Sequence, residues 1–366
     1  MKKAPGFPAP FFGSRGISSV EQTMGSHKAF QRGAIWWRAF RYHFVPPSFL
    51  PAILGAVIAW SISGRFSLGY FVVVVLAVTL NHIALNMTDD YYDYKQSVDR
   101  AAGHVENPYS GGSGLLTSGA IKPAHMRRVF LFLYFLTCAA GVFLTIMRGW
   151  PVIAFGLVGV LSAYFYTAPP VRYAYRGFGE VSQLLNFSLV IGLGAYFVQS
   201  RDLSWEAALA VLPLGLMMFA MITINEIPDS ESDGTGGKRT LVVNFGRSAG
   251  VWLYGAAGAA AYLVILGSPL FGLTTFWTYA SLLTFPMFAR AFSVLRRNYM
   301  NPAAMAPANM LTIRAHNLMG ILLIAAYVIR GVIGQRPPGQ MIVPLVILLV
   351  LYLPVAVTIF PRRQPR

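Results

Sequence analysis

Long apolar stretches, repeated along almost the whole chain, constrain its fold more than any other sequence feature. They lie at about residues 45–63, 67–88, 128–147, 150–169, 181–200, 205–226, 248–268, 272–292, 316–335 and 341–360. Each is close to the ~20 residues that a helix needs to cross a bilayer. Only 11% of the residues are charged, against about 25% in soluble domains, which disfavours a water-facing surface. The sequence therefore predicts an all-α, polytopic membrane helix bundle.

The basic residues divide unevenly between the two sides of the bilayer that these spans imply. All but five of the 29 Lys and Arg residues fall on one side; the five are Arg65, Arg148, Arg201, Arg330 and Arg336. Cytoplasmic loops carry an excess of basic residues, so the richer side is predicted to be the cytoplasm, with both termini there. This bias also accounts for the net charge of +16, so we expect no nucleic-acid partner. A bacterial inner membrane suits this pattern.

Two terminal segments flank the predicted bundle of residues 45–335. Residues 1–44 are basic and contain no apolar core of a signal peptide. Their last part mixes bulky aromatic residues with arginine, which favours a helix on an anionic membrane surface; a transit peptide is the alternative. Residues 336–366 would add an extra helix and a short basic tail. The single cysteine, Cys138, excludes an intrachain disulfide and a cysteine metal cluster.

Nine of the 13 acidic residues lie in two short segments, each at the cytoplasmic end of a predicted span. The first contains Asn86, Asp90 and Asp93, with Asp89 and Asp99 beside them. Because the first three are spaced four and three residues apart, they would share one face of a continuing helix. Carboxylates so close to the hydrocarbon need a compensating partner, which marks the segment as a candidate site.

The second acidic segment repeats this pattern on the same side of the membrane. Asn225, Asp229 and Asp233 are spaced by four, although a proline between them can kink or end the helix. Lys238 and Arg239 follow directly and would suit an anionic group. Because neither segment offers His or Cys ligands, the pair favours a hard cation such as Mg²⁺, which readily shares phosphate oxygens. The plainer alternative is that these acids only pair with nearby basic residues at solvated helix ends.

Two further segments agree with an anion site. Residues 107–114 form a glycine-rich loop whose N–H groups, including that of Ser113, could face a diphosphate. Tyr164, Tyr166 and Arg172 lie where the fourth predicted span ends. Aromatic residues there commonly anchor a helix at the interface, but beside a carbocation they would offer π-faces.

These motifs resemble those of the UbiA superfamily of intramembrane prenyltransferases. Residues 86–99, 225–241 and 166–180 carry the resemblance, which extends over about residues 45–335. It implies nine family-type membrane helices, with the tenth as an addition. Asp99, six residues after Asp93, is similar to the menaquinone branch, whereas Asp89 and Ser97 depart from the common pattern.

The resemblance implies Mg²⁺-dependent transfer of a polyprenyl chain from a prenyl diphosphate to a small aromatic acceptor. 1,4-Dihydroxy-2-naphthoate is the favoured acceptor; 4-hydroxybenzoate, homogentisate and a glyceryl phosphate lipid are the alternatives. Asp90, Asp93, Asp229 and Asp233 would hold the metal, and Lys238 and Arg239 would neutralise the departing diphosphate. Substrate-binding roles are expected for Asn86, Asn225, Asp99, Tyr164, Tyr166, Arg172 and Ser113. The polyprenyl tail would lie along apolar helices in the bilayer.

Two functions of other classes also fit a membrane bundle with acidic residues. A secondary transporter would use them along an ion pathway, although its binding groups usually lie near the midplane and within internal repeats. A lipid-binding scaffold would leave both acidic motifs unexplained. His82, one turn before Asn86, is interpreted as a buried structural histidine rather than a base.

Overall fold

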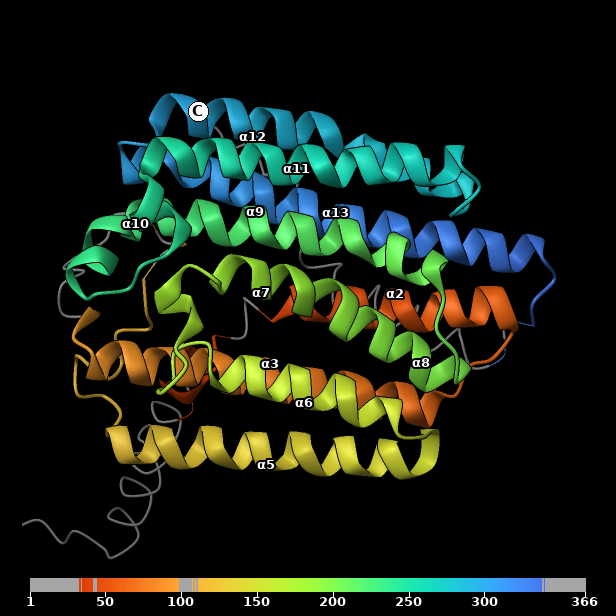
Figure 1. The fold of residues 1–366 in the computed structure, drawn as a ribbon, viewed down its shortest axis with the longest axis horizontal. Coiled ribbons are helices and arrows are strands. Elements are labelled where there is room, and N and C mark those ends of the chain that lie inside the picture. The colour runs from red at the N-terminus through yellow and green to blue at the C-terminus, as the bar shows by residue number, and fades with distance from the viewer. Residues whose placement is uncertain are drawn as a thin grey trace, which may run out of the picture.

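Helices lie side by side along one axis and form the scaffold of the molecule (Figure 1). The computed structural model describes residues 33, 35–41, 45–98, 107, 109, 111–337 and 339, and these residues contain no strand. The helices are α2 (Pro46–Ser63), α3 (Leu68–Lys95), α5 (Pro123–Arg148), α6 (Pro151–Tyr164), α7 (Gly179–Leu185), α8 (Gly194–Ser200), α9 (Trp205–Thr235), α10 (Leu241–Phe245), α11 (Arg247–Leu270), α12 (Phe285–Asn298) and α13 (Pro302–Ile333). Short 3₁₀ segments form η2 (Tyr173–Arg176) and η4 (Phe276–Thr284), and a π-helix, η3 (Asn186–Leu193), joins α7 to α8.

The prediction of an all-α membrane bundle is confirmed. Among the described residues, six helical stretches are long and apolar enough to cross a bilayer: α3, α5, the continuous stretch Gly179–Ser200, α9, α11 and α13. Helices α2 and α6 are apolar but shorter. The number of spans, nine plus a tenth, stays a prediction, because residues 341–360 lie outside the described part of the chain. The same holds for most of residues 1–44.

Helix ends differ from the predicted spans in ways that matter for the site. Helix α3 continues to Lys95 and α9 to Thr235, so both acidic motifs are helical. Pro228 does not end α9. The predicted span 272–292 is divided into η4 and α12, which begins with a proline in its first turn, where a missing N–H costs nothing.

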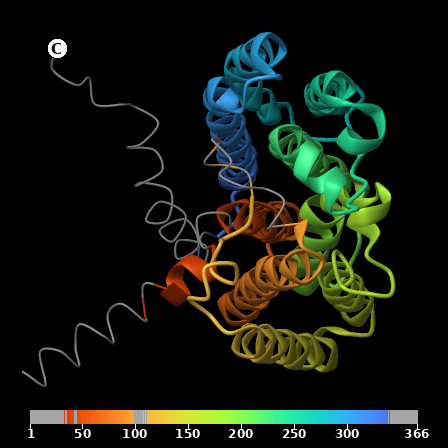
Figure 2. The ribbon, with the colours of Figure 1, turned by 90° about the vertical axis from the view of Figure 1, so that its left-hand side faces the viewer.

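Helices α3 and α9 end at the same end of the bundle, at the left of Figure 1, which is here called the site end. Figure 2 looks onto this end along the helices. Helix α9 packs closely against α7. A Cβ atom at Gly215 of α9 would lie only 2.3 Å from the carbonyl oxygen of Leu184 in α7. Glycine at position 215 therefore lets α9 pack directly against the backbone of α7.

The five arginines predicted on the side with few basic residues lie at the end of the bundle opposite the site end, where they bind other parts of the chain. Four of them, Arg65, Arg148, Arg201 and Arg336, donate to backbone carbonyls of Ser200, Gln199, Met147 and Ile62 at 2.7–2.9 Å. Arg330 pairs with Glu206. Carbonyls at helix ends have no partner within the helix, so these cations stabilise the ends of α2, α5 and α8.

Candidate active site

Both acidic motifs face one cavity of about 410 Å³ at the site end, here called the head cavity. Its polar lining comes from α3 (Asn86, Asp89 and Asp93), α9 (Asn225, Glu226, Asp229 and Asp233) and the segments between helices (Tyr166, Gly111, Gly112 and Lys238). Two motifs that the sequence assigned to the same side of the membrane thus line one cavity. Helices α9 and α13 add apolar side chains, including Met218, Met221 and Ile313, and α13 also adds Arg314 and Asn317.

The first motif is held by cations and hydroxyl groups. The buried Asp90 accepts hydrogen bonds through Oδ1 from Arg41 and from the N–H of Ser113, both at 3.2 Å. Asp93 accepts from the hydroxyl of Tyr175 at 2.6 Å and from Lys238 at 3.0 Å. These donors fix the carboxylates in place and offset their charge.

The second motif is tied to the glycine-rich loop and to α13. Asp229 accepts a hydrogen bond from the N–H of Gly111 at 2.9 Å. Asn225 accepts from the amide of Asn309 on α13 at 2.8 Å, and Asn309 in turn accepts from Asn107 at 3.2 Å. The loop thus joins α9 and α13, while its Ser113 N–H reaches α3. In this arrangement these two loop N–H groups point to carboxylates, which differs from the expected contact with a diphosphate.

Lys238 is the buried cation of the head cavity. Its ammonium lies 3.0 Å from Asp93 and 4.0 Å from Asp89. Burial alone would lower the pKa of Lys238, but these carboxylates outweigh that effect and hold the pKa well above its usual value. Burial, together with the nearby Asp93, raises the pKa of Tyr175, so its hydroxyl stays protonated and donates. Lys238 therefore stays protonated in the head cavity, where Asp93 and Asp89 offset its charge.

Arg41 is a site residue that the sequence interpretation missed. The segment before α2 was expected to lie on the membrane surface, yet Arg41 reaches the head cavity and pairs with Asp90. Its guanidinium also donates to the carbonyl oxygen of Gly111 at 3.2 Å. The only sequence signal was its place in a run of aromatic and basic residues. Tyr175 was missed as well, although it belongs to the segment that carried the family resemblance.

Several predicted site residues do not line the head cavity, and the buried Asp90 is one of them. Tyr164 belongs to an aromatic cluster, with its hydroxyl 3.3 Å from that of Tyr92. Arg172 donates to Gln96 at 2.7 Å and stands behind Tyr175. The side chain of Arg239 is exposed. Ser113 contributes its N–H. Asp99 lies outside the described residues.

The acidic side chains suit a metal that shares its coordination with a ligand. Within the part of the chain that the structure describes, no three His, Cys, Asp or Glu side chains converge into a ready-made metal site. However, Asp90 Oδ2 and Asp89 Oδ1 are buried without a hydrogen-bond partner. Buried carboxylate oxygens of this kind fit a hard cation, and Mg²⁺ usually takes only one or two carboxylates and completes its shell with water and phosphate oxygens.

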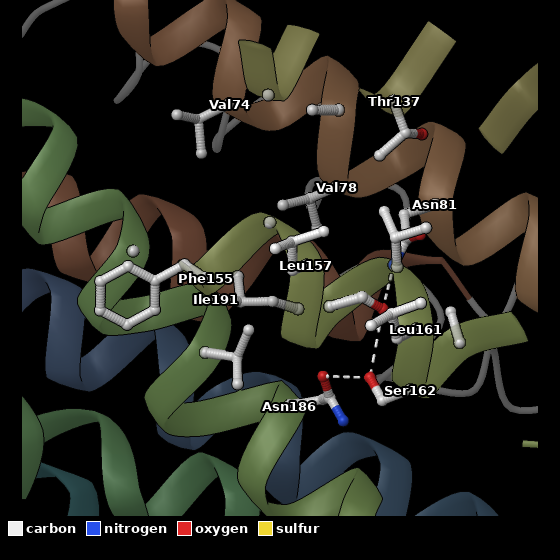
Figure 3. Close-up of a pocket in the computed structure, with 18 of the residues that line it drawn as sticks. Val74, Val78, Asn81, Thr137, Phe155, Leu157, Leu161, Ser162, Asn186 and Ile191 are labelled. Carbon is white, nitrogen blue, oxygen red and sulfur yellow. Dashed lines mark hydrogen bonds between the residues drawn. The ribbon is translucent and has the colours of Figure 1, made fainter. Parts of the chain in front are cut away.

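A second cavity of about 350 Å³ adjoins the head cavity and is here called the rear cavity (Figure 3). It lies among α3, α5, α6, η3 and α8, and most of its lining is aliphatic or aromatic, such as Val78, Phe155 and Ile191. Several of its polar side chains donate to backbone carbonyls or to other side chains. Ser162, for example, donates to Asn186 at 2.8 Å (Figure 3). The rear cavity therefore fits an apolar ligand.

Comparisons with known proteins find matches over most of the chain. The model of the UbiA prenyltransferase family matches residues 48–313. The chain is similar to the 1,4-dihydroxy-2-naphthoate octaprenyltransferase of Bacillus subtilis, with 28% identity covering 80% of this chain and 91% of that protein. The enzyme of the same name from Escherichia coli is 27% identical, with coverage of 80% and 94%. The fold is similar to a UbiA homolog from Archaeoglobus fulgidus bound to DMAPP and Mg²⁺, with TM-score 0.56, 15% identity and coverage of 79% and 98%.

Proposed function

The chain belongs to the UbiA prenyltransferase family, and we propose that it transfers a polyprenyl chain from a prenyl diphosphate to 1,4-dihydroxy-2-naphthoate with the help of Mg²⁺. It is a prenyl-transferring enzyme, so the transporter and scaffold interpretations are set aside. The observation that carries the finer proposal is the convergence of both acidic motifs and the buried Lys238 on one cavity.

The proposed metal ligands are Asp90, Asp93, Asp229 and Asp233. Bound Mg²⁺ would supply the positive charge that stabilises the departing diphosphate. Asn86 and Asn225 would orient the diphosphate and the carboxylates. The partnerless oxygen of Asp90 supports this assignment.

The proposed role of Lys238 is electrostatic. Its charge is already fixed in the cavity by Asp93, so it needs no reorganisation when negative charge develops on the leaving oxygen. Arg41 also lines the cavity and would give the diphosphate a second cation. Tyr166, buried in the cavity lining, presents a ring to the allylic cation that ionisation produces. We assign Arg239, which is exposed, at most a role in attracting the substrate.

The acceptor assignment rests on the relatives and on cavity chemistry. Relatives named for 1,4-dihydroxy-2-naphthoate prenylation match most of the chain, which supports a naphthoate over 4-hydroxybenzoate, homogentisate or a glyceryl phosphate lipid. The apolar walls of the head and rear cavities give a polyprenyl tail and a bicyclic ring surfaces to bury against. We place the site end at the cytoplasmic face of a bacterial inner membrane, where the basic residues gather.

The test is turnover in detergent with a radiolabelled prenyl diphosphate, Mg²⁺ and each of the four acceptors in turn. We expect product with 1,4-dihydroxy-2-naphthoate and none after chelation of Mg²⁺. Product with another acceptor alone would overturn the acceptor assignment while keeping the reaction class. Equal product in the presence of a chelator would overturn the metal assignment.

A further inference from the structure

Four side chains line both cavities and form the neck between them. They are His82 and Leu85 of α3, Gln183 of α7 and Phe187 of η3. Leu85 and Phe187 narrow the passage with apolar groups, whereas His82 and Gln183 bring hydrogen-bonding groups to it. A molecule that reaches from the acidic motifs into the apolar compartment must pass this neck.

His82 is held there by contacts on two sides. Its Nδ1 hydrogen-bonds the hydroxyl of Ser48 on α2. Its ring stands edge-on to Phe187, with the ring centroids 5.3 Å apart. The side chain is buried, and within the residues that the structure describes Nε2 has no hydrogen-bond partner. With its proton on Nδ1, the imidazole donates to Ser48 and leaves Nε2 as an acceptor at the neck.

The position of His82 along α3 sets what it can touch. Asp89 and Asp90 follow it by seven and eight residues, so they lie on the order of 10–12 Å further along the helix axis. That separation leaves room for a diphosphate and the first carbon of the prenyl chain between the carboxylates and the imidazole. His82 is therefore too far to serve the leaving group and stands where the ring that attacks the prenyl carbon would lie.

We propose that His82 is the proton acceptor for the ring hydroxyl of the aromatic acceptor, an inference that rests on the proposed function. Nε2 accepts the hydrogen bond of the hydroxyl and then its proton. Ser48 orients the imidazole, and Gln183 can bind a second polar group of the acceptor across the neck. A ring hydroxyl that gives up its proton makes the ring more electron-rich, which accelerates attack on the allylic cation.

The proton transfer fits a balanced reaction without any oxidant or reductant. The bond between the prenyl carbon and the diphosphate oxygen breaks, and its electron pair leaves with the diphosphate. The ring carbon that bears the carboxylate forms the new C–C bond while the hydroxyl becomes a carbonyl and its proton moves to Nε2. Loss of the carboxylate as CO₂ then returns an electron pair to the ring, and the imidazolium returns its proton to the ring oxygen. His82 is thereby restored.

Other bases of the described chain are less well placed. Asp93 and Asp229 already accept from Lys238 and from the N–H of Gly111. Glu226 lines the head cavity but not the rear cavity, so it is not at the neck. His316 is buried beside Asn317 and lines neither cavity. His82 is the histidine that combines burial, an orienting partner and access to both compartments.

The test compares His82→Asn and His82→Gln with the wild type in detergent. The asparagine amide retains a polar group near Nδ1 and removes Nε2, whereas the glutamine amide offers a polar atom near Nε2 that cannot take a proton. His125→Asn is the matched control, because His125 is exposed on α5 and lines neither cavity. The measurements are kcat, KM for each substrate, affinity for the prenyl diphosphate, the melting temperature, and rescue by added imidazole in His82→Gly.

We expect both His82 variants to lower kcat by about 10²–10³-fold. Affinity for the prenyl diphosphate and the melting temperature should stay near wild-type values, and imidazole should restore part of the activity of His82→Gly. Variants that keep kcat within about threefold would overturn the proposal, as would a parallel loss of diphosphate affinity and melting temperature, which would indicate a purely structural role. Failure of the wild type itself to prenylate any aromatic acceptor would overturn the proposed function instead.

Discussion

Replacement of Lys238 by methionine should both destabilise the protein and slow it. The ammonium is 3.0 Å from Asp93 and 4.0 Å from Asp89, and about a tenth of its side chain is exposed. Methionine keeps most of the apolar stem but leaves the carboxylates without their cation. Removal of one partner of a buried ion pair typically costs about 3–5 kcal/mol. For a chain of 366 residues, such a loss lowers the melting temperature by about 4–7 °C.

The kinetic effect of Lys238→Met follows from the same contacts. One charge-assisted contact to the departing diphosphate contributes about 2–3 kcal/mol, which corresponds to a loss of kcat of roughly 30–150-fold. The assay is thermal unfolding in detergent together with single-turnover kinetics. Arg239→Met is the stability control, because the adjacent arginine is exposed and should shift the melting temperature by less than about 1 °C. Equal shifts for the two variants would refute the reasoning that burial decides the difference.

Three further predictions concern the carboxylates, the N-terminal arginine and helix packing. Asp90→Asn should reduce turnover by at least about 10³-fold at saturating Mg²⁺, because it removes the charge of a proposed metal ligand, and it should also lower the melting temperature, because Arg41 loses its ion-pair partner. Retained turnover would contradict the metal assignment. Arg41→Gln should raise KM for the prenyl diphosphate by about 10-fold in steady-state kinetics. An unchanged KM would show that Arg41 only holds the glycine-rich loop in place through Gly111. Gly215→Ala should destabilise the protein by about 1–3 kcal/mol, because the added Cβ atom would meet the backbone of α7. The control is Gly141→Ala, where an added Cβ atom meets nothing within 4 Å. Equal melting temperatures of the two variants would contradict the packing argument.

Apolar periodicity and charge distribution predicted the scaffold well because a bilayer leaves a chain few choices. Stretches of about 20 apolar residues must become helices, and their order along the chain fixes which ends meet. The convergence of the two acidic motifs followed from this, since both were assigned to the same side. Predicted helix ends were less accurate. The predicted spans end where the run of apolar residues ends, but helices α3 and α9 continue through the acidic motifs.

Contacts that depend on tertiary structure could not be predicted from the sequence. Arg41 pairs with Asp90 across 49 positions of the chain, and no local pattern encodes such a contact. Tyr164 and Tyr166 look equivalent in the sequence, yet only Tyr166 reaches the head cavity, because α6 ends at Tyr164 and the chain then changes direction. The neck at His82 was also not predicted, since it requires the registers of α2, α3, α7 and η3 together.

The central claim is that two sequence-distant acidic motifs form one Mg²⁺–diphosphate site. Calorimetric binding of an unreactive prenyl thiodiphosphate, with and without Mg²⁺, tests it most directly in the wild type and in Asp90→Asn, Asp229→Asn and the double variant. The account predicts Mg²⁺-dependent binding that either single substitution weakens at least about tenfold, with the double variant little worse than the singles because the residues act as a unit. Binding that survives without Mg²⁺, or that either motif supports alone, would contradict it.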